Sequence, residues 1–164
     1  MLEDLNVPAT RIAEMLIARG QKIVVADGAT GGLISAALLT VPGATKFHLG
    51  GGVIYSFRGR DLLYGLEKEA YRGMRSSTKD YALLQARAIR TSFDADWAIA
   101  ESGSVGGSVH PGGVASGTSA CAVVGPDGEF ARVLETGTDE RIANMRAFTE
   151  HALELLEDAL AGRA

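Results

Sequence analysis

The sequence predicts an α/β fold in which helices cover both faces of a mixed β-sheet, giving an α/β/α layered arrangement. Short apolar runs that suit buried strands alternate with segments of helical spacing. Late in the chain, two apolar runs flank the turn at residues 125–128, which predicts an antiparallel hairpin beside the strand–helix–strand units. A length of 164 residues suits one domain, and no linker or repeat divides it, so we expect residues 1–164 to form a single domain.

The first half of the chain alternates helical and strand patterns. The predicted elements are a helix over Pro8–Arg19, a strand over Lys22–Ala26, a helix over Leu33–Leu39, a strand over Lys46–Ser56 and a helix over Arg58–Tyr64. Ile12 and Leu16 have helical spacing, and Gly20 is a typical residue to end a helix. The β-branched run from Ile23 to Val25 is typical of a strand buried on both faces. Gly50-Gly51-Gly52 predicts a bulge or a close crossing of two backbones.

The second half adds a long helix, three strands and a C-terminal helix. The predicted elements are a helix that Ser76 or Ser77 caps and that ends near Phe93, a strand over Asp96–Ala100, a loop over Ser102–Gly113, strands over Gly117–Val124 and Glu129–Thr136, and a helix over Asp139–Ala161. The last helix is expected to bury the face that carries Ile142, Met145 and Phe148. Asp139 and Glu140 in its first turn suit the positive end of the helix dipole.

The composition argues against several classes of partner. A net charge of −4 gives no basic field for a phosphate backbone or for anionic lipid, so we expect neither nucleic acid nor a membrane as partner. The N-terminal residues lack an export signal, and no apolar stretch approaches the roughly 20 residues of a membrane helix. We therefore expect a cytoplasmic protein. Closed assemblies of identical subunits are common among such proteins, so we also expect a homo-oligomer.

The reactive residue types form few recognisable patterns. His48, His110 and His151 lie far apart and lack zinc-binding spacings, so we expect no metal site and no cofactor. His48 and His151 are expected to be structural, whereas His110, in a glycine-rich loop, is a candidate for the site. Cys121 is the only cysteine and lies in an apolar run, where we expect an inert buried thiol. Residues 76–79 match Ser-x-x-Lys, but its companion motifs are absent, so we interpret them as a helix cap.

Polar residues gather where the predicted strands end. They are Asp27, Thr30 with Gly31 and Gly32, the pair Tyr55 and Ser56, and the run from Glu101 to Ser104. Sheets of α/β proteins collect their ligand-binding groups at strand ends. Hydroxyls, two carboxylates and free backbone N–H groups suit a small polar or phosphorylated ligand, although no obvious nucleophile–base pair is visible.

At these residues the chain resembles the CinA C-terminal domain family, whose characterised members remove the amide of nicotinamide mononucleotide. Four stretches carry the resemblance over nearly the whole chain. They are Ala26-Asp27-Gly28-Ala29-Thr30-Gly31-Gly32 against Ala-Glu-Ser-x-Thr-Gly-Gly, Gly52-Val53-Ile54-Tyr55-Ser56 against Gly-x-x-x-Tyr-Ser-Asn, Ser102-Gly103-Ser104-Val105-Gly106 against Ser-Gly-Ile-Ala-Gly, and Gly117-Thr118 against a strand entrance. Arg141 resembles the arginine of the family's Gly-Asp-Arg.

The departures from the family fall on its catalytic positions. Gly28 stands where the family has its serine nucleophile, and a glycine has no side chain that could attack an amide. Arg60 stands at the position of the family's basic lysine, and a guanidinium stays protonated and cannot act as a base. The resemblance therefore implies a family site that has lost its serine–lysine pair.

Two functions of different class follow from this reading. In the first, the protein binds a mononucleotide-like small molecule without cleaving it. The residues expected to contact that ligand are Gly28, Thr30, Gly31, Gly32, Tyr55, Ser56, Arg60, Ser102, Gly103, Ser104, Thr118 and Arg141. In the second, it is an amidohydrolase of altered mechanism, in which Thr30 or Ser104 supplies the hydroxyl and Asp27, Glu101 or His110 activates it. A third reading, a scaffold or oligomerisation module, leaves the polar strand ends without a role.

Overall fold

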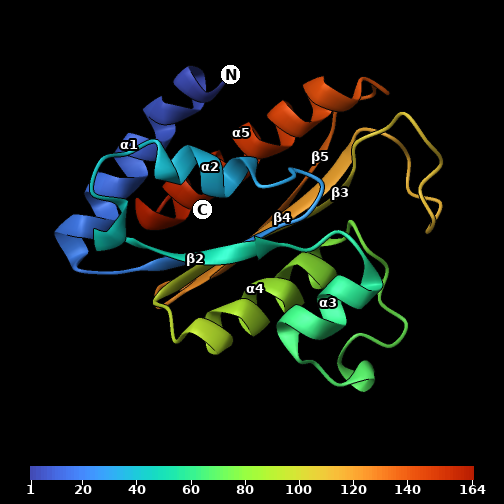
Figure 1. Ribbon diagram of the computed structural model, residues 1–164, viewed down its shortest axis with the longest axis horizontal. Coiled ribbons are helices and arrows are strands. Elements are labelled where there is room, and N and C mark those ends of the chain that lie inside the picture. Colours follow the sequence, from blue (N-terminus) through green and yellow to red (C-terminus); the bar gives the residue numbers. More distant parts are fainter.

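A computed structural model describes all residues, 1–164, and shows one five-stranded sheet between two layers of helices (Figure 1). The elements are α1 (Leu2–Arg19), β1 (Ile23–Asp27), α2 (Leu33–Leu39), η1 (Ala44–Lys46), β2 (His48–Val53), α3 (Phe57–Tyr64), η2 (Lys68–Ala70), α4 (Lys79–Phe93), β3 (Trp97–Ser104), β4 (Thr118–Gly125), β5 (Gly128–Glu135) and α5 (Arg141–Leu160). The strand order is β2-β1-β3-β4-β5. β1 pairs parallel with β2 and β3, whereas β4 pairs antiparallel with β3 and β5, so the predicted mixed sheet is confirmed.

Two hydrophobic cores hold the helices to the sheet, one on each face. Helices α1, α2 and α5 pack on the face that carries Ile23, Val25 and Trp97. Helices α3 and α4 pack on the opposite face, where Val24 and Ala26 are buried. Successive side chains of a strand point to opposite faces, so the uninterrupted apolar run in β1 serves both cores. The predicted α/β/α layering follows from this alternation.

The glycines of β2 let its backbone approach that of β1 closely. An ideal Cβ at Gly51 would lie 1.8 Å from the carbonyl oxygen of Val25, a separation that no side chain tolerates. The register shifts at the start of the pair, where Ile23 faces His48 and Val24 faces Gly50. The predicted bulge and close crossing are thus both present.

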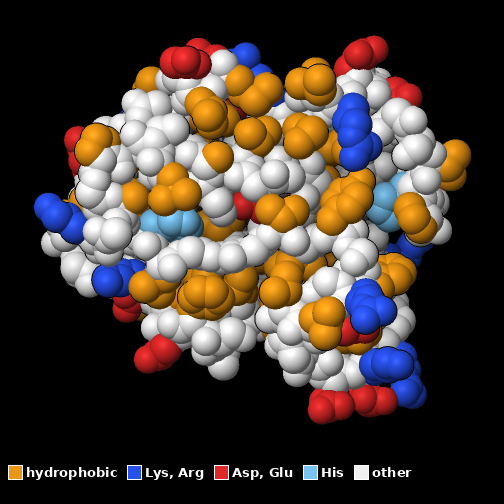
Figure 2. All heavy atoms as spheres, viewed as in Figure 1, with side chains coloured by type: hydrophobic (Ala, Val, Ile, Leu, Met, Phe, Trp, Pro, Cys, Tyr) orange, Lys and Arg blue, Asp and Glu red, His pale blue; other side chains and the backbone are white.

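β2 is also an edge strand, and the surface around it is apolar. Leu49 and Val53 on this strand are exposed. On the face shown in Figure 2, hydrophobic side chains gather over the middle of the molecule while most charged side chains lie around the rim. None of the helices is both long and hydrophobic enough to be a membrane-crossing segment.

Several element boundaries differ from the sequence prediction. Helix α1 begins at Leu2 rather than at Pro8, because Leu5 packs into the core and its burial offsets the cost of a proline inside the helix. The N-cap of α4 is Thr78, whose hydroxyl accepts a hydrogen bond from the N–H of Tyr81, and not Ser76 or Ser77.

The boundaries nearest the polar strand ends differ as well. β3 continues through Ser104, so residues 102–104 belong to a strand and not to a loop. Helix α5 begins at Arg141, which leaves Asp139 and Glu140 ahead of its first turn. Ile142 is 70% exposed and does not join the buried face of α5.

Candidate functional site

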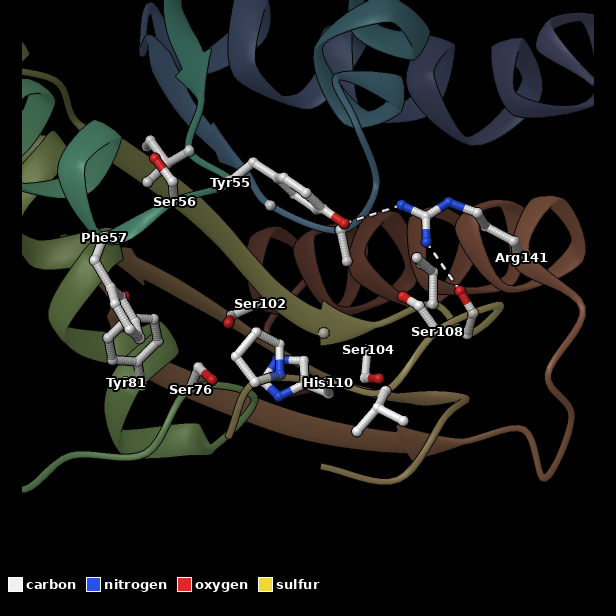
Figure 3. A pocket seen from close by; sticks show the side chains of 18 of the residues that line it. Tyr55, Ser56, Phe57, Ser76, Tyr81, Ser102, Ser104, Ser108, His110 and Arg141 are labelled. Atoms are coloured by element: carbon white, nitrogen blue, oxygen red, sulfur yellow. Dashed lines mark hydrogen bonds between the residues drawn. The ribbon is translucent and has the colours of Figure 1, made fainter. Parts of the chain in front are cut away.

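The main pocket lies where the polar ends of β1 and β3 meet the start of α5 (Figure 3). Its volume is about 530 Å³, which is within the size range of small-molecule sites. The lining comes from the turn after β1 (Gly28, Ala29), the segment after β2 (Ile54, Tyr55, Ser56, Phe57), the approach to α4 and its first turns (Ser76, Tyr81, Gln85), the end of β3 with the following loop (residues 102–106 and 108–111) and Arg141. Sequence segments far apart in the chain therefore converge on one cavity.

Arg141 is the only lysine or arginine among the lining residues, and its guanidinium is held in place at the pocket edge. One terminal nitrogen donates a hydrogen bond to the carbonyl oxygen of Gly106, and the other donates to the hydroxyl of Tyr55, both at 2.9 Å (Figure 3). A guanidinium carries five N–H donors, so donors remain for a ligand. This end of the pocket is suited to an anionic group such as a phosphate or a carboxylate.

Asp27 does not line the pocket; its carboxylate forms hydrogen bonds that hold the start of α2 in place. The residue is 1% exposed. It accepts hydrogen bonds from the hydroxyls of Thr30 and Ser35 at 2.8 and 2.7 Å, and from the backbone N–H groups of Ile34 and Ser35 at 3.0 and 3.2 Å. The carboxylate thus pairs with backbone N–H groups in the first turn of α2, and its negative charge interacts favourably with the positive N-terminal end of the helix dipole.

Thr30 is also fully buried and is absent from the pocket wall. Its hydroxyl donates to Asp27, and its backbone N–H donates to the carboxylate of Glu101 at 3.0 Å. The hydroxyl and a carboxylate are therefore within hydrogen-bond distance, as the altered-mechanism hypothesis requires. Both groups nevertheless lie behind the wall, where a ligand in the pocket does not contact them.

Glu101 lies beside this pair, with no exposed surface and no cationic partner. Its carboxylate accepts a hydrogen bond from the hydroxyl of Ser119 at 2.6 Å. Burial raises the pKa of Glu101 to about 7, and the nearby charge of Asp27 acts in the same direction. Glu101 does not line the pocket either.

The serines of β3 do line the pocket, but they are not paired with a base. The hydroxyl of Ser102 accepts a hydrogen bond from the N–H of Ser77 at 3.1 Å. Ser104 is 5% exposed, and no hydrogen bond joins its hydroxyl to Asp27, Glu101 or His110. Figure 3 shows His110 between the two serines, at the pocket face of the loop after β3.

His110 is positioned to donate a hydrogen bond rather than to accept a proton. Its Nδ1 accepts a hydrogen bond from the N–H of Gly112 at 3.0 Å, so the neutral ring carries its proton on Nε2. A base at this position would first have to change tautomer. His48 and His151 lie elsewhere, half-buried, and burial lowers the pKa of each.

Gly28 forms part of the pocket wall through its backbone alone. An ideal Cβ on this residue would lie 2.2 Å from the carbonyl oxygen of Glu101 and 3.2 Å from one of that residue's carboxylate oxygens. The ends of β1 and β3 are therefore closer here than any side chain at position 28 allows. The space that a serine nucleophile would occupy is filled by the neighbouring strand.

Arg60, expected among the ligand contacts, is not among the residues that line the cavity. Its guanidinium stacks on Tyr71 at 3.5 Å and on Phe57 at 5.0 Å from the ring centroids, and pairs with Asp61 at 2.9 Å. Only 8% of the residue is exposed. Its contacts indicate that it anchors α3 and the segment after it.

The other predicted contacts divide between the pocket and its surroundings. Ser56 lines the pocket and caps α3 by accepting a hydrogen bond from the N–H of Gly59 at 3.0 Å. Gly31, Gly32 and Thr118 are outside the lining: the two glycines, with φ of 67° and 96°, form the turn into α2, and Thr118 pairs with Ser104 in the sheet.

Several lining residues were missed by the sequence reasoning. Phe57 directly follows the selected pair Tyr55 and Ser56. Ser76, Tyr81 and Gln85 lie far from the glycine-rich segments, and the helical pattern around Tyr81 predicts only a core position. Helical spacing of apolar residues does not distinguish a side chain that packs against the core from one that borders a cavity. No cluster of three or more His, Cys, Asp or Glu side chains is arranged to hold a metal ion.

The cysteine and the Ser-x-x-Lys match give no catalytic group. Cys121 is buried in β4, and burial raises the pKa of its thiol to about 12, so the thiolate is disfavoured at neutral pH. Lys79 of the Ser-x-x-Lys match is exposed, opens helix α4 and does not line the pocket.

Comparisons with known proteins agree on one family. The family model of the CinA C-terminal domain matches residues 6–160. A CinA-like protein of Prochlorococcus marinus (strain MIT 9313) is 34% identical over 79% of this chain and 30% of its own length. A CinA-like protein of Myxococcus xanthus is 28% identical over 96% of this chain and 37% of its own length. The chain thus spans about a third of the length of these relatives.

Solved structures show the same fold. A CinA superfamily protein from Klebsiella pneumoniae superposes with a TM-score of 0.88 and 25% identity, covering 96% of this chain and 98% of that one. A competence/damage-inducible protein from Agrobacterium tumefaciens superposes with a TM-score of 0.87 and 24% identity, covering 95% of each chain.

Proposed function

The chain belongs to the CinA C-terminal domain family, and we propose that it binds a mononucleotide-like ligand without hydrolysing it. The observation that carries this proposal is the position of Gly28, which lines the pocket but lies against the carbonyl oxygen of Glu101. A wall built in this way has no nucleophile at the position where the family's serine is expected. It also has no room for one without movement of the backbone.

The remaining groups support binding rather than covalent chemistry. A nucleophilic hydroxyl needs a base within about 2.6–3.2 Å. The carboxylates Asp27 and Glu101 lie behind the wall, and the Nδ1 of His110 is occupied by a backbone donor. The serine hydroxyls that reach the cavity are therefore available as hydrogen-bonding groups for a ligand.

The layout of the pocket matches the parts of a mononucleotide. Arg141 supplies a cation with unused donors at one side, which suits a phosphate. Phe57 and Tyr81 line the other side, near Ser76, where an aromatic base can stack (Figure 3). Ser102 and Ser104 lie between these two sides and can contact a ribose.

The test combines calorimetric titration of nicotinamide mononucleotide with an assay for released ammonia on the same protein. The proposal expects binding and no ammonia above a protein-free blank. Ammonia release that Ser104→Ala abolishes, and that the exposed-site control Ser92→Ala keeps, would instead establish an amidohydrolase of altered mechanism. Absence of both binding and turnover would reject the mononucleotide as ligand.

A further inference from the structure

One buried carboxamide in the pocket wall has no hydrogen-bond partner. Gln85 lies on α4, one turn after Tyr81, and is 3% exposed. It lines the same cavity as Arg141, yet its Oε1 accepts no hydrogen bond within the protein. A buried polar group is normally paired, so this one requires an explanation.

The other glutamine of the chain shows the usual arrangement. Gln21 accepts a hydrogen bond from the indole N–H of Trp97 at 2.8 Å, which fixes both side chains at the edge of the core. Gln85 lies on the same buried part of α4 as Ala82 and Ala86, and it lines the pocket together with Ile54. An apolar side chain of the same length would suit these surroundings better. The unpaired carboxamide at position 85 therefore lowers the stability of the folded protein when no ligand is bound.

We propose that Gln85 determines the ligand's head group by pairing with a neutral amide, one that carries an N–H donor beside a C=O acceptor. This inference rests on the proposed function, in which Arg141 takes the anionic end of the same ligand. The Gln85 carboxamide offers one acceptor and two donors, so an amide satisfies both kinds of group at once. A carboxylate head group can only accept, and it leaves Oε1 of Gln85 unpaired.

The terminal torsion of a glutamine side chain is broad, so the carboxamide can turn to align with either end of a bound amide. Tyr81, one turn before Gln85 on α4, and Phe57 line the same pocket and supply flat surfaces for the ring to which such an amide is attached. The pocket consequently distinguishes an amide from the corresponding acid, although it lacks the means to convert one into the other.

The experiment compares wild type with Gln85→Met and with the matched control Gln21→Met. Calorimetry measures the affinity of each for nicotinamide mononucleotide and for nicotinic acid mononucleotide, which differ only in the amide and the acid. We expect wild type to prefer the amide by about tenfold or more, and Gln85→Met to reduce this preference to within about threefold. A preference that Gln85→Met leaves unchanged would overturn the inference.

Thermal unfolding of the free proteins supplies a second readout that does not depend on the ligand. We expect Gln85→Met to raise Tm by about 2–4 °C, because it removes an unpaired buried amide, and Gln21→Met to lower it. A lower Tm for Gln85→Met would show that the carboxamide has a structural partner, and would count against a ligand role.

A fragment titration separates failure of this inference from failure of the proposed function. The side-chain amide signal of Gln85 in a ¹H–¹⁵N spectrum is identified by its loss in Gln85→Met. If neither mononucleotide binds but nicotinamide shifts this signal and nicotinate does not, the mononucleotide is rejected while the amide-reading role stands. If nicotinamide leaves the signal in place, Gln85 does not read an amide.

Discussion

The α-carbon of Gly28 faces the backbone carbonyl oxygen of Glu101 so closely that a Cβ at position 28 would lie 2.2 Å from that oxygen. Gly28 directly follows β1 and Glu101 lies within β3, just after the last pair of these two strands, Ala26 and Ala100. The backbone of β3 therefore fills the space that a side chain at position 28 would need. A single substitution does not restore that space, because the obstructing atom belongs to the backbone.

This contact predicts that Gly28→Ser lowers the free energy of unfolding by about 1–3 kcal/mol or more, as overpacking does elsewhere. The double variant Gly28→Ser with Arg60→Lys is expected to release no ammonia from nicotinamide mononucleotide. Urea unfolding and the ammonia assay measure the two effects. Gly52→Ala is the matched control, because its Cβ would make only an ordinary contact at 3.5 Å from Leu63. A stable double variant that turns over would show that the site is merely degenerate.

Arg141 is predicted to carry most of the affinity for the anionic end of the ligand. Charged hydrogen bonds contribute roughly 1.5–3 kcal/mol, so Arg141→Ala should weaken binding of nicotinamide mononucleotide by about 10- to 150-fold. Tyr55→Phe, which removes one partner of the guanidinium, should cause a smaller loss. Arg146→Ala on the exposed side of α5 is the control and should bind as wild type. Equal affinity of Arg141→Ala and wild type would place the anionic group elsewhere.

Asp27 is predicted to act in folding and not in chemistry. In Asp27→Asn an amide replaces one oxygen that accepts hydrogen bonds from Thr30 and Ile34 or from Ser35, so buried donors lose their partner. We expect the free energy of unfolding to fall by roughly 1–3 kcal/mol, with ligand affinity retained in the folded fraction. Asp94→Asn, at the left-handed C-cap of α4, should be nearly neutral. A stable Asp27→Asn protein that no longer binds ligand would assign Asp27 to the site.

Glu101 is predicted to make the protein less stable as the pH rises. A carboxylate paired with a cation has the opposite effect, because its pKa is lowered on folding. Burial raises the pKa of Glu101 from 4.5 to about 7, so the unfolded chain releases this proton first as the pH rises. Below pH 4.5 the Glu101 carboxyl is protonated in both the folded and the unfolded chain, and its contribution to the free energy of unfolding is fully present. As the pH rises from 4.5 to about 7, this contribution is lost, and the free energy of unfolding falls by at most about 3 kcal/mol.

Two histidines titrate in the same range with the opposite sign. Burial lowers the pKa of His48 and of His151, so their neutral folded forms lose stability as the pH falls through about 6.5. The contribution of Glu101 is therefore obtained as the difference between wild type and Glu101→Gln in urea unfolding at pH 5 and pH 7.5. The exposed-site control Glu135→Gln should keep the wild-type difference. Identical pH dependence in wild type and Glu101→Gln would show that Glu101 is ionised throughout.

The amino-acid sequence by itself determined the layered α/β fold. Apolar runs of strand length, the hairpin turn at residues 125–128 and the amphipathic pattern of α5 are local signals, and each is confirmed by the structure. Family membership was also determined by short motifs that the sequence displays directly. Boundaries were wrong where long-range packing decided them, as at Leu2, whose helix is extended by burial of Leu5, and at Ser102–Ser104, which pair with β4 despite having no apolar pattern.

Only the tertiary structure decided which polar residues reach the cavity. In the sequence, Asp27, Thr30 and Glu101 stand at predicted strand ends just as Ser102 and Ser104 do, but their side chains lie behind the pocket wall and bond to one another. Gln85 and Tyr81 have the spacing of core residues, yet they border the pocket. Side-chain direction at a strand end depends on the crossing of neighbouring strands and on the helices packed over them. Those relations join residues far apart in the chain, so no local pattern contains them.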